Sequence, residues 1–265
     1  MYCLSSLSNC SLEQVAAESK GPLMFELDLR LPQKVRDDLL QRVLAHSQYK
    51  AVILNAFYRS NNVTENEWKH DFELPPHLKL GSLEKYRAQH GTSEKLRDAY
   101  GLTAGPTELS AQEVKRVKSN VQGRLKVVVK GVMCPEDALD ALDQGADAIW
   151  VSNGGSTKPF SAPATIQVLP HISKAVKAKY PDRPIFIDSG ISRGTDVVKC
   201  IAYGASAVFI SRPVMWALQH KGEEACTKLM TILNEEIRLA MALTHCYKLD
   251  EITEAQVIHQ LGPKL

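Results

Sequence analysis

Short runs of consecutive apolar residues alternate with helix-like segments along the second half of the chain. The apolar runs are 127–129, 148–151, 185–187 and 207–210. Because every position in these runs is apolar, both faces of each predicted strand should be buried, as in a parallel sheet. The runs recur at intervals of roughly 20–35 residues, which is the size of a βα unit. The pattern therefore predicts an α/β fold.

The first half of the chain repeats this alternation less clearly. Residues 2–4, 24–27 and 52–54 are strand candidates, and helices are predicted at 12–17 and 35–45. The complete pattern predicts seven strands. Seven parallel strands are compatible with an open doubly wound sheet or with a (β/α)8 barrel that lacks one strand, and alternation alone does not separate these folds.

A polar stretch with glycine and proline, from about residue 58 to 110, interrupts the alternation. A loop of this length inside a compact domain is usually functional. The chain of 265 residues has a length that single α/β barrel domains commonly reach. We therefore expect residues 1–265 to form a single domain with this long loop.

Composition excludes several functional classes. The net charge is +2, and 44% of the residues are hydrophobic. No run of Lys and Arg is long enough to predict nucleic-acid binding, and no apolar run approaches the length of a membrane span. The six cysteines lack CxxC spacing, so the sequence predicts no metal site.

The C-terminal residues Pro263-Lys264-Leu265 differ only at their first position from the Ser-Lys-Leu peroxisomal signal. The tail predicts a peroxisomal protein, and the alternative is a cytoplasmic protein whose tail is not a signal.

Candidate binding residues follow the last two predicted strands. Asp188-Ser189-Gly190 and Arg193 follow one strand, and Ser211-Arg212 follows the next. In α/β barrels the last two loops commonly bind phosphate, because glycine permits close backbone approach and helix N-termini offer N–H groups. The two arginines would add charge-assisted hydrogen bonds. The alternative is that the glycines only form a tight βα turn.

Two further polar residues follow apolar strands. Lys130 comes directly after three valines, and Ser152 follows the strand at 148–151. A lysine in this position either extends to solvent along apolar neighbours or faces a ligand. Because ligands meet the carboxyl ends of barrel strands, the ligand-binding interpretation is favoured.

Several motifs resemble those of the FMN-dependent 2-hydroxy acid oxidases and dehydrogenases. The motifs are Val129-Lys130-Gly131-Val132, Val151-Ser152-Asn153, Arg193-Gly194-Thr195-Asp196-Val197 and Ser211-Arg212-Pro213, with a weaker match at Leu4-Ser5-Ser6. The match begins at the family's second strand, so the first strand and the helices before it have no counterpart. The resemblance therefore implies a TIM (β/α)8-type barrel without that part, which accounts for a count of seven.

The resemblance also implies FMN as cofactor and a set of residues that contact it. Phosphate is expected near the loops at 188–193 and 211–212, and Lys130 is expected near N1 of the flavin, where positive charge stabilises the reduced anion. The expected FMN-binding residues are Ser5, Asn55, Lys130, Ser152, Asp188, Ser189, Gly190, Arg193, Ser211 and Arg212.

The sequence departs from the family at the reaction centre. The family reads Ser-Asn-His-Gly-Gly-Arg where this chain has residues 152–157. The histidine, which is the general base, corresponds to Gly154, and the arginine that binds the substrate carboxylate corresponds to Thr157. A family glutamine corresponds to Glu26, whose carboxylate would repel a reduced flavin unless it is protonated or turned away. No catalytic residue is therefore assigned.

These features lead to two functional hypotheses. The first is an FMN-dependent (S)-2-hydroxy acid oxidase, acting on a small 2-hydroxy acid, whose activity is weak or lost. The alternative is a non-catalytic scaffold or a regulatory partner of intact family members. The chain is expected to form a homo-oligomer or to associate with such members, and to bind neither nucleic acid nor membrane.

Overall fold

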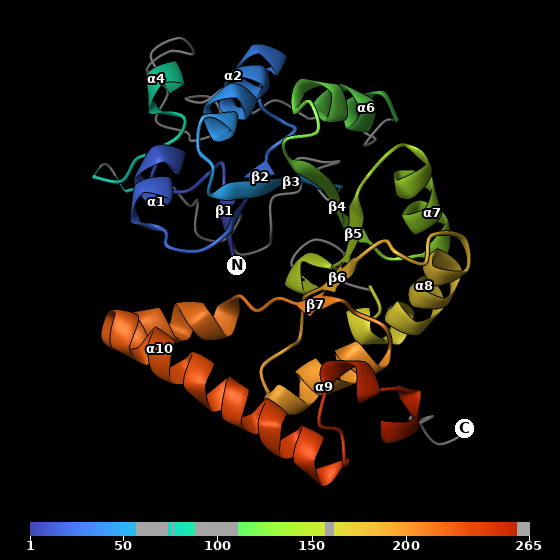
Figure 1. Ribbon diagram of the computed structural model, residues 1–265. Helices are drawn as coiled ribbons and strands as arrows, with labels where there is room; N and C mark the ends of the chain where they lie inside the picture. Colours follow the sequence, from blue (N-terminus) through green and yellow to red (C-terminus); the bar gives the residue numbers. More distant parts are fainter. Residues whose placement is uncertain (57–73, 76, 88–110, 157–161, 259–265) are drawn as a thin grey trace. The chain divides into compact units, whose positions relative to one another are not determined.

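The computed structural model describes residues 1–56, 74–75, 77–87, 111–156 and 162–258 (Figure 1). Most of the long loop predicted at 58–110 lies outside these residues. The chain divides into two compact units, each described here by itself. Unit 1 comprises Met1–Gly131 and Asp140–Ile149, and unit 2 comprises Val132–Leu139 and Trp150–Leu265.

The described residues form one seven-stranded sheet, and its strands follow one another in chain order. The strands are β1 Tyr2–Ser5, β2 Leu23–Leu27, β3 Tyr49–Asn55, β4 Lys126–Val132, β5 Ala148–Val151, β6 Ile185–Ile187 and β7 Ala207–Val208. Within unit 1, β1 through β4 pair in parallel, and β6 pairs in parallel with β7 in unit 2. A doubly wound sheet reverses its strand order at a switch point, so this sequential order favours the barrel alternative.

Helices connect the strands, as the alternation predicted. They are α1 Leu12–Glu18, α2 Gln33–Leu44, α4 Glu84–Arg87, α6 Ala111–Asn120, α7 Pro135–Asp143, α8 Thr165–Lys179, α9 Gly194–Ala202 and α10 Arg212–Leu243, with 3-10 turns η1 Gly154–Ser156, η2 Leu249–Glu251 and η3 Glu254–Gln256. The long α10 contains two residues with non-helical backbone angles, Lys221 and Gly222. It is therefore two helices joined at a kink.

The core of unit 1 lies between its strands and α1 and α2. Phe25 of β2, Leu39 of α2 and Val52 of β3 are fully buried. The rings of Phe25 and Tyr49 meet edge to face, with their centroids 6.1 Å apart. The Tyr49 hydroxyl donates a 2.9 Å hydrogen bond to the Leu12 carbonyl, so the polar tip of this buried ring is satisfied.

A glycine allows the segment before α4 to pack tightly on the start of α1. A Cβ at Gly81 would lie 2.4 Å from the backbone nitrogen of Ser11. Ser11 itself forms a capping box with Gln14, and the Leu12 N–H donates to the Ser82 hydroxyl at 2.9 Å. Side chains of two segments therefore accept hydrogen bonds from the N-terminus of α1.

Unit 2 has an aromatic cluster and a helix pair. The Trp150 and Phe209 rings lie 4.1 Å apart, and Phe186 meets both of them at larger angles. Helix α9 packs against α10 (Figure 1). A Cβ at Gly194 would lie 2.5 Å from the Glu236 Cβ, so the absence of a side chain at the start of α9 permits this contact.

Helix α1 is joined to α2 by a partly exposed ion pair with a predicted pH dependence. Arg42 donates two hydrogen bonds to the Glu13 carboxylate, at 2.7 and 2.9 Å. This pairing lowers the pKa of Glu13 from 4.5 to about 2. Because the folded protein holds this proton more weakly than the unfolded chain, the stabilisation is present above pH 4.5 and is lost as the pH falls through 2.

We predict that Glu13→Gln lowers the free energy of unfolding at pH 7 by up to about 1 kcal/mol, because the carboxylate is partly exposed. The difference from the wild type should shrink steadily between pH 4.5 and 2, as urea denaturation would measure. Glu18→Gln, at an exposed position of the same helix, is the control. If wild type and Glu13→Gln differ as much in free energy of unfolding at pH 2 as at pH 7, the ion pair with Arg42 is not the source of the difference.

Candidate functional site

Three of the predicted FMN-binding residues lie near the carboxyl ends of neighbouring strands in unit 1. Ser5 is the last residue of β1, Asn55 is the last of β3, and Lys130 lies near the end of β4. The register pairs Asn55 with Lys130 and pairs Ser5 with Glu26 of β2. The parallel pairing therefore brings these residues to one edge of unit 1.

Glu26, which the sequence marked as an electrostatic problem, is held by Asn55. The Asn55 side-chain amide donates a 2.6 Å hydrogen bond to Glu26 Oε1, and Asn55 is buried. The neighbouring carboxylate of Asp28 is 2% exposed and is neutralised by Arg30, whose Nη2 lies 2.6 Å from Oδ2. Both acidic side chains at this edge therefore have defined hydrogen-bond donors.

The loop after β5 in unit 2 has an unusual backbone. Gly154, Gly155 and Ser156, which form η1, have φ angles of 62°, 67° and 62°. Left-handed angles are accessible to glycine but uncommon for serine. The Asn153 side chain supports the turn, because its Oδ1 accepts a hydrogen bond from the Ser156 N–H at 3.2 Å. The fully buried Ser152 accepts another from the Gly154 N–H at 3.3 Å.

Ser189 ties the loop after β6 to this turn. Its hydroxyl accepts a hydrogen bond from the Gly155 N–H at 3.1 Å and donates one to Asp188 Oδ1 at 2.8 Å. Thr165, at the start of α8, donates to the Asp188 carbonyl at 2.7 Å. Ser189 itself has φ of 76°, so its two hydrogen bonds offset a backbone strain on the order of 1–3 kcal/mol.

Arg212 approaches the same turn from the start of α10. Its Nη2 donates a 3.3 Å hydrogen bond to the Gly155 carbonyl, and a Cβ at Gly155 would lie 3.0 Å from that nitrogen. Gly155 is thus held by Ser189 through its N–H and by Arg212 through its carbonyl. We refer to Gly155, Asp188, Ser189 and Arg212 as the glycine clamp.

Gly190 and Ser211 flank the glycine clamp, whereas Arg193 is engaged elsewhere. A Cβ at Gly190, which has φ of 74°, would meet no atom within 4 Å, so the space beside it is open. The Arg193 Nη2 lies 2.7 Å from Glu236 Oε1. The structure therefore brings Asp188, Ser189, Gly190 and Arg212 together, but it directs the Arg193 side chain toward α10.

The first N–H groups of α9 are capped by carboxylates of the chain itself. Asp196 Oδ2 accepts from the Ser192 and Arg193 N–H groups, at 3.1 and 3.0 Å. Glu236 Oε2 accepts from the Gly194 N–H at 2.7 Å. These carboxylates already occupy the start of α9, which disfavours a further anion there.

Comparison with known proteins identifies the family. The model of the family described as FMN-dependent dehydrogenase matches residues 1–259. This chain belongs to that family. A 2-hydroxyacid oxidase of Dictyostelium discoideum is 36% identical over 258 residues, which cover 97% of this chain and 64% of that protein. 2-Hydroxyacid oxidase 1 of Homo sapiens is 33% identical over 262 residues, which cover 96% and 69%.

Solved structures of oxidases share the fold. A lactate oxidase of Pediococcus acidilactici matches with a TM-score of 0.82 at 29% identity, over 95% of this chain and 65% of that one. A mandelate oxidase matches with a TM-score of 0.79 at 30% identity, over 95% and 67%. The predicted TIM-barrel class is therefore confirmed. The chain spans about two thirds of its relatives' length, which agrees with a match that begins at the family's second strand.

Membership of the FMN-dependent dehydrogenase family supports FMN as the cofactor. The FMN-binding set inferred from sequence remains a prediction, and Thr157, at the expected arginine position, lies outside the described residues. Within the described part of the chain, no helix is long and apolar enough to cross a membrane. The same residues contain no cluster of three or more His, Cys, Asp or Glu side chains arranged for a metal ion.

Sequence reasoning missed the contacts that organise these residues. It identified Ser189 and Arg212 but not their shared partner Gly155, and it did not anticipate that Glu236 would engage Arg193 from 43 positions along the chain. Local patterns carry no signal for such pairs. The one local clue was the concentration of small residues after β5 and β6.

We predict that Ser189→Ala lowers the free energy of unfolding by roughly 1–2 kcal/mol, because it removes both hydrogen bonds and retains a Cβ at a left-handed φ. Ser189→Gly should cost less, because it relieves that strain. Chemical denaturation measures both effects, and Ser192→Ala, at an exposed position of the same loop, is the control. If Ser189→Gly lowers the free energy of unfolding more than Ser189→Ala does, backbone strain at position 189 is not offset by these hydrogen bonds as described.

Proposed function

We propose that this chain binds FMN and that its oxidation of 2-hydroxy acids is weak or lost. The observation that carries the proposal is the combination of an anion-compatible glycine clamp with a glycine at the position of the family's histidine. FMN supplies a two-electron acceptor when bound. The proposal thus separates cofactor binding, for which side chains are present, from proton transfer, for which the expected group is missing.

The residues of unit 2 fit the phosphate of FMN in part. Arg212 is exposed and uses one N–H on Gly155, so four of its five donors can address an anion. The open space beside Gly190 permits close approach to its backbone. Arg193 contributes less to phosphate binding than its motif implies, because its guanidinium forms an ion pair with Glu236.

Unit 1 supplies the residues proposed for the isoalloxazine end. The cation of Lys130 favours a reduced, anionic flavin, whereas the carboxylate of Glu26 opposes it. Hydrogen bonding to Asn55 fixes the Glu26 carboxylate in place. The electrostatic effect of Glu26 on a flavin is consequently a property of this chain that the family's glutamine would not have.

Turnover requires a base, and Gly154 has no side chain to supply one. Loss of a general base lowers a rate by about 10²–10⁴-fold. Replacement of the carboxylate-binding arginine by Thr157 would weaken substrate orientation as well, since threonine cannot form a bidentate pair. We therefore propose little or no oxidation of small 2-hydroxy acids.

A scaffold or regulatory role is the second candidate, and α10 carries the observation that favours it. Met215, Trp216 and Leu218 are each about 60% exposed near its start. Exposed apolar side chains that lie close together are typical of interaction sites. Such a role would involve association with intact family members or with further copies of this chain.

The remaining elements of the proposal concern organisation and location. We propose that residues 1–265 function as one domain, with the long segment at 58–110 as its major loop. We also propose peroxisomal targeting through Pro263-Lys264-Leu265, with a cytoplasmic location as the alternative.

We predict that the purified protein takes up FMN and shows a bound-flavin absorption spectrum. Arg212→Gln should weaken FMN affinity by about tenfold or more, because a hydrogen bond to a charged group contributes roughly 1.5–3 kcal/mol. Titration followed by flavin fluorescence measures this change. Arg238→Gln, at an exposed position of the same helix, is the matched control and should bind as the wild type does.

Anaerobic addition of glycolate or lactate to the FMN complex tests the second half of the proposal. We expect the flavin spectrum to bleach at least about 100-fold more slowly than in a relative with the histidine. Rapid bleaching would show that other groups replace the base. A protein that takes up no FMN would leave the scaffold role as the surviving candidate.

A further inference from the structure

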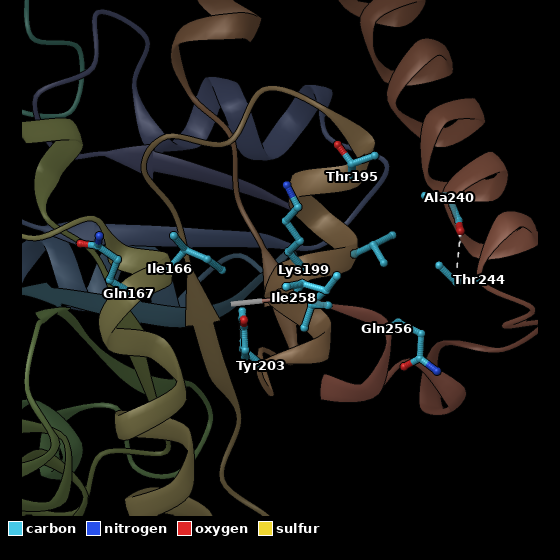
Figure 2. A pocket seen from close by; sticks show the side chains of 11 residues that line it. Ile166, Gln167, Thr195, Lys199, Tyr203, Ala240, Thr244, Gln256 and Ile258 are labelled. Atoms are coloured by element: carbon cyan, nitrogen blue, oxygen red, sulfur yellow. Dashed lines mark hydrogen bonds between the residues drawn. The ribbon is translucent and has the colours of Figure 1, made fainter. Parts of the chain in front are cut away.

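A cavity in unit 2 lies among helices, apart from the strand ends and the glycine clamp. Its volume is about 450 Å³, within the range of small-molecule sites. Figure 2 shows Ile166 and Gln167 of α8 on one side and Ala240 and Thr244 of α10 on the other, with Lys199 and Tyr203 of α9 between them. The cavity is therefore formed by three helices together with the segment around η3.

One face of α9 points into this cavity. Thr195, Val198, Lys199 and Tyr203 follow the i, i+3, i+4, i+8 spacing that aligns side chains along a helix. Val198 is buried, and Lys199 and Thr195 are exposed at the rim. The cavity thus has an apolar floor and polar groups at its opening.

The lining has a clear charge preference. Lys199 is the one lining residue that carries a full charge at neutral pH, and no Asp or Glu lines the cavity. Lys199 makes no ion pair within the part of the chain that the structure describes. The apolar lining comes from Ile166, Val198, Ala240 and Val257, and from Ile258, which is largely exposed to solvent. A ligand with an alkyl part and a single negative charge complements this surface.

The polar neighbours of Lys199 also favour an acceptor group. Gln167 Oε1 is engaged by the Ala164 N–H at 3.2 Å, which leaves the amide NH₂ of Gln167 to act as a donor. The Thr244 hydroxyl donates to the Ala240 carbonyl at 2.9 Å and is thereby turned back onto its helix. The groups that remain for a ligand are therefore chiefly donors.

We propose that this cavity binds a medium-chain monocarboxylate, with its alkyl chain on the apolar floor and its carboxylate at Lys199. The site involves none of the residues proposed to contact FMN, so it is a second site on the chain. Its lining comes from α8, α9, α10 and the segment around η3.

Isothermal titration calorimetry of the full chain with octanoate tests the proposal. We expect saturable binding at one site per chain and a negative heat-capacity change, which marks burial of the alkyl group. Lys199→Met should weaken binding by about fivefold, in the range of an exposed ion pair. Lys174→Met removes the same charge from an exposed position of α8 outside the cavity and should leave the affinity unchanged.

A second variant tests the location without relying on charge. Thr195→Trp places a large ring at the rim from an exposed position, and it should abolish saturable binding while thermal unfolding shows an intact fold. The proposal is overturned if wild-type protein does not bind octanoate. It is also overturned if Lys199→Met and Thr195→Trp both bind as the wild type does, which would place octanoate at another site.

Discussion

Burial of both faces of the parallel strands is the constraint from which the candidate site follows. Six of the seven residues of β3 are buried, and all four of β5 are buried. Such strands have no position for a ligand-binding polar side chain except near their ends. Asn55 and Ser152 are therefore found where the strands terminate. These polar residues lie beside the core. A polar group there that lacks a hydrogen-bond partner therefore lowers the stability of the fold.

The glycine clamp shows how unit 2 meets that requirement with its own groups. The N–H and the carbonyl of Gly155 both have partners, from Ser189 and Arg212 respectively. These contacts rigidify the turn after β5 and use part of the hydrogen-bonding capacity that a ligand would otherwise engage. Arg212 has donors to spare, because a guanidinium carries five. Ser189 has none left, since its single proton is donated to Asp188. In the proposed anion site, Arg212 and nearby backbone would therefore contact the anion, whereas Ser189 is a positioning residue.

The sequence predicted the elements better than their contacts, for a physical reason. Apolar runs report burial directly, so all seven strands were predicted near their observed positions. The sequence did not predict the kink of α10 at Lys221 and Gly222, where the chain is helical on both sides. The motif containing Arg193 indicated phosphate binding, yet its side chain pairs with Glu236. Likewise, Glu26 was expected to need protonation or reorientation, and its partner Asn55 comes from another strand. Side-chain partners that are distant in sequence depend on tertiary packing, which periodicity and local motifs do not encode.

The glycine at the position proposed for the family's histidine is part of the turn after β5. Gly154, Gly155 and Ser156 all adopt left-handed angles, a conformation that costs a residue with a side chain roughly 1 kcal/mol or more. Glycine at 154 thus adopts the observed backbone without that cost, and it has no side chain that could accept a proton. A side chain at 155 would likewise require the Arg212 guanidinium to shift, because a Cβ there would lie 3.0 Å from its Nη2. A histidine introduced at 154 would have to adopt the strained angle or open the turn, and opening it would disturb the contacts of Ser189 and Arg212. Gly154, at the proposed position of the base, and Arg212, proposed to hold phosphate, therefore belong to one hydrogen-bonded arrangement of this chain.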